Sequence, residues 1–90
     1  MKKYVIERDL PGVGAMDANQ LKGAAATSNA ALAKLSPRVQ WLQSFVTSDK
    51  TFCIYLAEDE DAVREHAQLS GFPANKITEV TGVIDPSTGG

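Results

Sequence analysis

Along the chain, segments whose apolar residues recur at every second position alternate with segments whose apolar residues recur at the three- to four-residue spacing of a helix. Alternation with β-branched and aromatic residues predicts strands at residues 3–9, 39–47, 51–57 and 77–84. Apolar residues at three- and four-residue steps predict helices over residues 18–35 and 58–70. The element order is therefore β-α-β-β-α-β.

Capping residues support both helices. Asp17, with Gln20 three positions later, is typical of a capping box at a helix start. The acidic run 58–61 could be taken for a metal cluster, but acids in a first helical turn complement the helix dipole, and we favour that interpretation. Gly71 suits the end of the second helix.

This order, with right-handed crossovers, predicts an α+β fold of the ferredoxin-like type. Its four-stranded antiparallel sheet would carry both helices on one face and leave the other face uncovered. We expect one domain over residues 1–86 and a flexible tail over residues 87–90.

The central hairpin decides which residues lie on the uncovered face. A three-residue loop at 48–50 would pair Phe45 with Cys53 and Gln43 with Tyr55, whereas a two-residue loop would place Gln43 beside Ile54. We favour the longer loop because it leaves an aliphatic and aromatic set to pack under the helices. The uncovered face would then carry Val5, Glu7, Trp41, Gln43, Phe45, Cys53, Tyr55 and Glu79.

Aromatic side chains on an uncovered face indicate an interaction surface. Two copies meeting face to face would form a homodimer, a dimeric α+β barrel, around a partly polar cavity. Trp41, Phe45 and Tyr55 would line that cavity, together with Glu79.

Composition excludes several classes of protein. Nine basic and eleven acidic residues give a net charge of −2, so bulk charge does not favour nucleic acid. One cysteine excludes a disulfide framework within one chain. No segment approaches the roughly 20 apolar residues of a membrane helix, and the start lacks a signal-peptide core. We expect a cytoplasmic protein that binds neither nucleic acid nor membrane.

Metal binding is the chemistry that the residue types suggest first. Cys53 and His66 supply the thiolate and imidazole that nickel, copper and zinc accept, and Glu7 and Gln43 could add oxygen donors. A dimer would present each donor twice. The plainer alternatives are a packed core cysteine and a hydrogen-bonded histidine inside the second helix.

Three stretches resemble a family of small bacterial nickel-binding or nickel-responsive proteins. They are Tyr4–Arg8 with Leu10–Gly12, then Val39–Thr47 with Cys53–Tyr55, and finally Arg64–Ala67 with Gly71–Ala74, Ile77, Glu79–Val80 and Ile84–Pro86. The resemblance implies a dimeric ferredoxin-like domain and a divalent metal, with Glu7, Cys53, Tyr55 and His66 as family-pattern residues. The family pattern commonly has histidine where this chain has Gln43, a poorer ligand, and we expect that departure to weaken metal binding.

The leading hypothesis is a small dimeric, non-enzymatic protein that binds nickel or a similar divalent metal, with Cys53 as its anchor. The first alternative is a dimeric α+β barrel enzyme or small-molecule-binding protein that uses the cavity on the helix-free face. There Glu7, which could form a carboxylate pair with Glu79, would be the base, and Tyr55 would orient the substrate. A plain interaction module is the other alternative.

Overall fold

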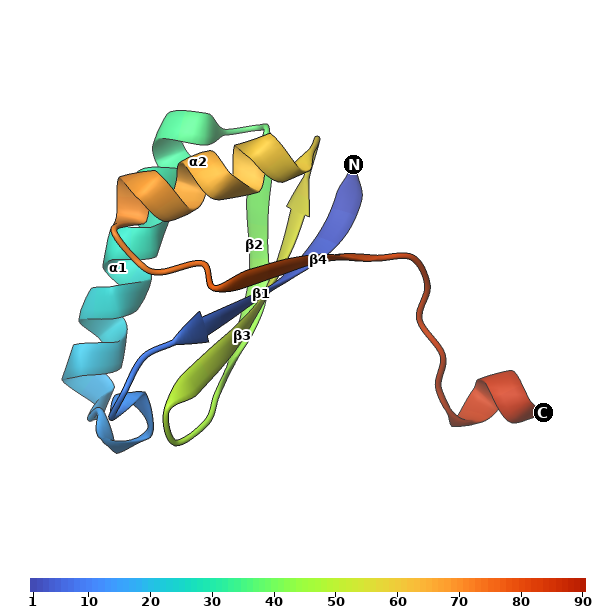
Figure 1. Cartoon of the computed structure of the whole chain (residues 1–90), viewed down its shortest axis with the longest axis horizontal. Helices are drawn as coiled ribbons and strands as arrows, with labels where there is room; N and C mark the ends of the chain where they lie inside the picture. Colours follow the sequence, from blue (N-terminus) through green and yellow to red (C-terminus); the bar gives the residue numbers. More distant parts are fainter.

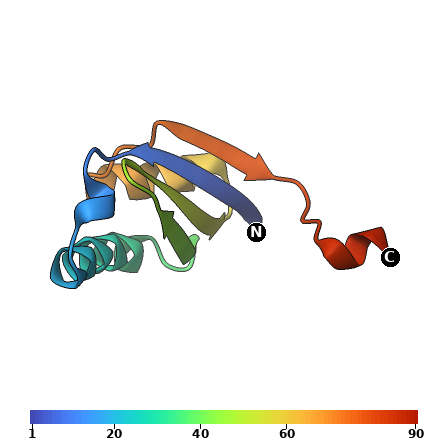
Figure 2. The same ribbon diagram turned by 90° about the horizontal axis from the view of Figure 1, so that it is seen from below.

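The computed structural model describes residues 1–90 as one sheet with two helices packed on one face (Figures 1 and 2). The main elements, in chain order, are β1 (Lys2–Asp9), α1 (Ala18–Leu35), β2 (Val39–Val46), β3 (Lys50–Ala57), α2 (Glu60–Ser70) and β4 (Lys76–Val80). Short 3₁₀ helices, η1 (Val13–Ala15) and η2 (Pro86–Gly89), precede α1 and end the chain.

The sheet has the strand order β2-β3-β1-β4, and all of its pairings are antiparallel. The first and third strands are therefore central and the helices connect across them, which is the predicted ferredoxin-like α+β arrangement. No helix is both long enough and apolar enough to span a membrane.

The helix ends follow the capping residues in the sequence. Asp17 and Gln20 form the expected capping box at the start of α1, with each side chain bonded to the other's backbone N–H. Asp59 caps α2, whose first turn carries Glu60 and Asp61, as the dipole argument requires. Gly71 ends α2 in the left-handed conformation, with φ 77°.

The register predicted for the central hairpin is wrong. Phe45 pairs with Phe52, Ser44 with Cys53 and Gln43 with Ile54, which is the register of the two-residue loop. Thr47 and Lys50 close the turn, because the Thr47 N–H donates to the Lys50 carbonyl over 2.9 Å. A bulge at Leu42 then shifts β2, so that Trp41 lies opposite Tyr55.

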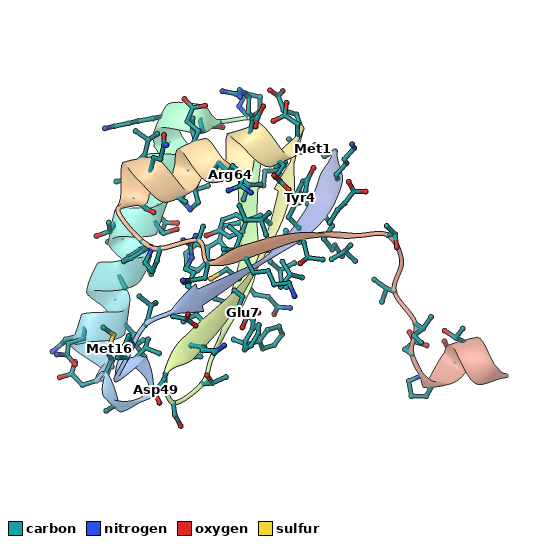
Figure 3. The ribbon with its side chains drawn as sticks, viewed as in Figure 1. Met1, Tyr4, Glu7, Met16, Asp49 and Arg64 are labelled. Atoms are coloured by element: carbon teal, nitrogen blue, oxygen red, sulfur yellow. The ribbon has the colours of Figure 1, made fainter.

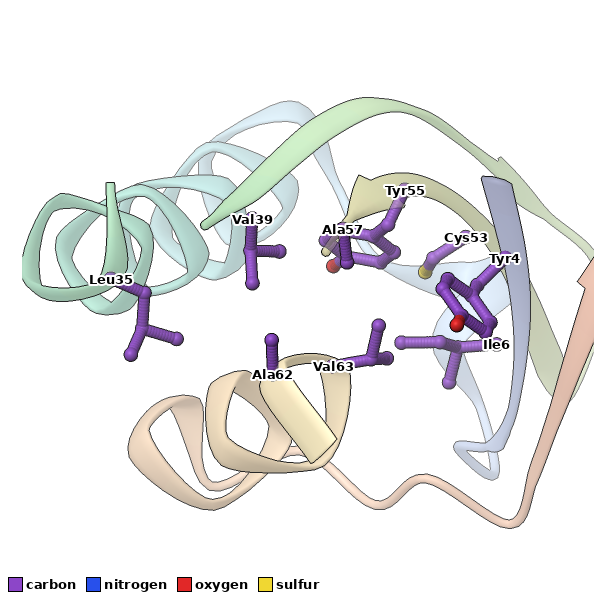
Figure 4. Close-up of a cluster of buried hydrophobic side chains, with 9 residues drawn as sticks. All are labelled: Tyr4, Ile6, Leu35, Val39, Cys53, Tyr55, Ala57, Ala62 and Val63. Atoms are coloured by element: carbon purple, nitrogen blue, oxygen red, sulfur yellow. The ribbon is translucent and has the colours of Figure 1, made fainter. Parts of the chain in front are cut away.

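Four predicted cavity residues lie on the helix-covered face, because of the hairpin register, the bulge in β2 and the pairing of β4 with β1. Cys53 and Tyr55 are buried beneath the helices, and Trp41 and Glu79 face the same side because they pair with Tyr55 and Tyr4. Figure 4 shows Cys53 and Tyr55 pointing from the sheet toward the helices. The cavity proposed for the open face therefore cannot contain them.

The open face carries a different set of residues. Its central rows consist of Val5, Glu7, Gln43, Phe45, Phe52, Ile54 and Leu56, which alternate with the buried positions of their strands. Glu7, Gln43 and Phe45 thus lie on the face where we expected them. The expected apolar character is retained, but aliphatic residues of β3 replace the cysteine and tyrosine.

The C-terminal strand is shorter than predicted. It ends at Val80, and the chain then leaves the sheet as an arm that ends in η2 (Figures 1 and 2). Val83 and Ile84, predicted to extend the strand, are 72% and 84% exposed on this arm.

The connection between β1 and α1 is fixed to the hairpin turn. The N–H groups of Leu10 and Gly12 donate to the backbone and side chain of Asp49, and the Gly14 N–H donates to Ser48. A Cβ at Gly14 would lie 2.7 Å from the Ser48 Cα, so only glycine permits this approach. The contact holds Val13 and Met16 over the space between α1 and the sheet, where both line a cavity.

Candidate functional site

A chain of buried polar groups lies between the sheet and the two helices. Alternation along β1 and β3 directs Arg8 and Tyr55 to this side, and α1 and α2 add Ser28 and His66. All four residues are at least 95% buried. Buried polar groups are costly unless they are bonded, so these contacts fix the centre of the molecule.

Arg8 is a buried cation without an anionic partner. Its Nη1 donates to the carbonyls of Pro73 and Phe72 over 2.7 and 3.3 Å, and its Nη2 donates to the Tyr55 hydroxyl over 3.5 Å. The guanidinium also lies 5.9 Å from the ring centre of Phe72. None of the ion pairs of the chain includes Arg8. The charge is held only by neutral groups.

His66 is neutral and only partly bonded. Its Nε2 lies 3.0 Å from the Tyr55 hydroxyl and 3.4 Å from the Ser28 hydroxyl, while its Nδ1 is buried without a partner. Burial, with a smaller contribution from the nearby Arg8 charge, lowers the pKa of His66 to about 4. Burial also raises the pKa of Tyr55. The contacts are consistent with Arg8 donating to Tyr55, and Tyr55 donating to the neutral imidazole.

A cavity of about 280 Å³ adjoins this polar chain. Arg8, Ser28 and Tyr55 are among its lining residues, and Cys53 and Trp41 are part of its sheet wall. The N-terminal half of α1 covers it with small residues such as Ala24 and Ala25. The buried positions of α1 all lie in its C-terminal half, at Ser28, Ala31 and Leu35.

The structure separates the four predicted metal ligands into two pairs. Glu7, labelled on β1 in Figure 3, and Gln43 lie on the open face, whereas Cys53 and His66 lie on the covered face. Glu7 is bonded to Lys50 over 2.7 Å, and this contact lowers the Glu7 pKa. Glu79 pairs with Tyr4 and forms a 3.8 Å ion pair with Lys2, so it does not oppose Glu7.

A single chain does not assemble a metal site from its charged and soft donors. No three His, Cys, Asp or Glu residues come together anywhere in residues 1–90. The donor set therefore does not fit a nickel ion held by one copy alone.

Sequence reasoning did not single out Arg8 and Ser28, which belong to the buried polar chain. A signal for Arg8 was present, because the β1 alternation places it on the same face as Tyr4 and Ile6. A charged residue on an otherwise apolar strand face needs partners, and this is what the structure shows. Ser28 lies on the apolar stripe of α1 and gives a weaker signal.

Comparison with known proteins identifies the family. A model of the SCO4226-like family, described as nickel responsive proteins, matches residues 4–80. The chain belongs to this family. No curated protein sequence matches the chain.

A solved structure shares the fold. The crystal structure of SCO4226 from Streptomyces coelicolor A3(2) superposes with a TM-score of 0.76 at 19% sequence identity. The match covers 91% of this chain and 99% of SCO4226. The similarity extends over the whole ferredoxin-like domain, so both chains build the same sheet and helices.

The low pKa of His66 predicts a loss of stability in mild acid. Unfolding restores the ordinary pKa of 6.5, so the unfolded state binds more protons between about pH 6.5 and pH 4. Stability is fully present above this range and falls as the pH decreases through it, by about 2 kcal/mol at pH 5. Urea unfolding of wild type and His66→Gln, compared at neutral pH and at pH 5, measures the difference. An equal pH dependence in both proteins would show that His66 is not the group responsible.

Proposed function

We propose that this member of the SCO4226-like family is a non-enzymatic, nickel-binding homodimer whose two copies meet through their open sheet faces. The family description supports nickel as the metal. The proposal rests on the open face of the sheet, which is apolar and which a single chain leaves uncovered. Glu7 and Gln43 lie among the apolar residues of this face.

The open face has the chemistry of a subunit interface. Phe45 is 54% exposed and lies opposite Phe52, and Leu42, at the bulge in β2, is 48% exposed. Contiguous apolar residues of this kind mark interaction sites on globular proteins. A second copy is the partner that two-fold symmetry provides most simply, since it buries the same patch twice.

The C-terminal arm supports the same partner. It extends away from the body of the chain and carries Val83 and Ile84, whose side chains are largely exposed (Figure 1). A second subunit against the sheet would bring an apolar surface near this arm. We therefore propose that Val83 and Ile84 become buried when the dimer forms.

The proposed dimer would also supply the metal-binding side chains that a single chain lacks. Glu7 and Gln43 occupy neighbouring rows of the open face, and each would be present twice between two copies. The carboxylate of Glu7 is ionised, because Lys50 lowers its pKa, and is therefore in the form that binds a cation. Cys53 was expected to anchor this site, but it lies on the other face of the sheet.

The alternative function, a barrel enzyme or small-molecule-binding protein with its cavity on the open face, has a weaker basis. Tyr55, which was to orient a substrate there beside Glu7, is on the covered face. The cavity of about 280 Å³ is on the covered face as well. A small molecule would therefore bind on the covered face and not on the open face.

Nickel titration tests the metal site. We expect Glu7→Gln to weaken binding at least tenfold, because it replaces the charged oxygen donor with a neutral amide. Lys50→Met should strengthen binding, because Glu7 then loses the cation that competes for its carboxylate. Calorimetric titration of wild type and both variants gives the affinities and the number of ions per dimer.

Cys53→Ser and His66→Gln are the matched controls for the other donor pair. If nickel binds on the open face, both variants keep the wild-type affinity, and binding releases no thiol proton. Loss of binding in Cys53→Ser with retention in Glu7→Gln would assign the metal to the covered face and overturn the proposed site.

The oligomeric state tests the interface separately from the metal. We expect the wild type to be a dimer and Phe45→Ser to dissociate more readily, because the substitution removes a large apolar group from the centre of the interface. Leu69→Ser is the matched control, since Leu69 on α2 is similarly exposed at 45% but lies outside the open face. Sedimentation equilibrium distinguishes the states, and a monomeric wild type would refute the homodimer.

A further inference from the structure

We propose that the cavity between α1 and the sheet binds a small carboxylic acid with an aliphatic or aromatic body, whose carboxylate meets Arg8. This site is separate from the open face and does not depend on nickel or on dimer formation. It rests on the lining of the cavity, on a lining cation, Arg8, that has no anionic partner, and on the hydroxyl groups that also line the cavity.

The cavity wall suits an apolar body. Leu21 and Ala25 from α1, Val13 and Met16 from the preceding connection, and Trp41 from β2 all contribute to it. The volume of about 280 Å³ is near the lower end of the range for small-molecule pockets.

The rim shows how a ligand could enter. Met16, Leu21 and Val46 line the cavity, yet each is more than a third exposed. These side chains therefore have one side toward solvent and the other toward the cavity. Figure 3 shows Met16 beside the start of α1, close to the hairpin turn.

Arg8 gives the cavity its charge preference. A buried cation is costly unless an anion or several hydrogen bonds compensate for it. The three hydrogen bonds of Arg8 go to neutral oxygens, whereas a guanidinium has five N–H donors. A carboxylate would accept from the remaining donors and supply the missing negative charge.

The neighbouring hydroxyls complete the recognition of an acid. Tyr55 and Ser28 also line the cavity, and both are bonded to the neutral His66. Their O–H groups are donors that can turn from the imidazole to a carboxylate oxygen. No Asp or Glu lines the cavity, so nothing there repels an anion.

Matched acids and alcohols test this inference. Octanoate and 1-octanol share an aliphatic body, and phenylacetate and 2-phenylethanol share an aromatic one. Trp41, the single tryptophan of the chain, lines the cavity, and its fluorescence reports occupancy. We expect at least one acid to bind wild type ten- to a hundredfold more tightly than its alcohol, as a charge-assisted contact provides.

Arg8→Met separates a ligand-binding role from a structural one. Methionine preserves the apolar packing of the side chain, and replacing a buried charge in this way is often tolerated. We expect the variant to lose its preference for the acid but to bind the alcohol as wild type does. A preference that persists in Arg8→Met would overturn the assignment of Arg8.

A second pair of variants keeps the test valid even if Arg8→Met fails to fold. Ala25→Leu should fill the cavity and weaken binding of the acid at least tenfold, while Ala26→Leu, on the exposed side of α1, should not. Equal binding by these two variants would place the ligand elsewhere. No response of Trp41 to any of the four compounds, up to their solubility, would refute the site.

Discussion

The register of the β2–β3 hairpin determines which chemistry lies on which face of the sheet. A strand directs successive side chains to opposite faces, so a slip of one residue exchanges them all. The two-residue turn buries Cys53 and Tyr55 beneath the helices and exposes Phe45 on the other side. Asp49 fixes this turn, because it accepts from the N–H groups of Leu10 and Gly12.

The sheet consequently separates two kinds of surface. One face is apolar, accessible and crossed by the Glu7–Lys50 ion pair, and it is the face that we propose for a second subunit and a shared nickel ion. The other face holds an uncompensated cation and a chain of hydroxyl and imidazole groups beside an apolar cavity. Nickel binding and acid binding would therefore use opposite sides of one thin layer. Because β1 contributes Glu7 to one side and Arg8 to the other, the two activities can be tested independently.

Local sequence signals were sufficient for the elements and the topology. The capping box at Asp17, the acidic first turn of α2 and Gly71 each act within a few residues of the element they delimit. The order of elements then left few topologies, and the ferredoxin-like fold followed. The last strand was predicted too long, since Val83 and Ile84 have strand propensity but no neighbouring strand to pair with.

The candidate site was harder to predict because its geometry depends on distant contacts. The turn at Ser48 and Asp49 is selected by the close approach of Gly14, more than 30 residues earlier in the chain. The bulge at Leu42 has no local glycine or proline to indicate it. The alternation of β1 did place Arg8 on the helix side, but only the structure shows that no acidic residue meets it there.

Cross-strand proton contacts measured by NMR test the register directly. The structure predicts contacts that pair Ser44 with Cys53 and Gln43 with Ile54. Contacts that instead pair Phe45 with Cys53 and Gln43 with Tyr55 would return the thiol to the open face and contradict the separation of the two surfaces.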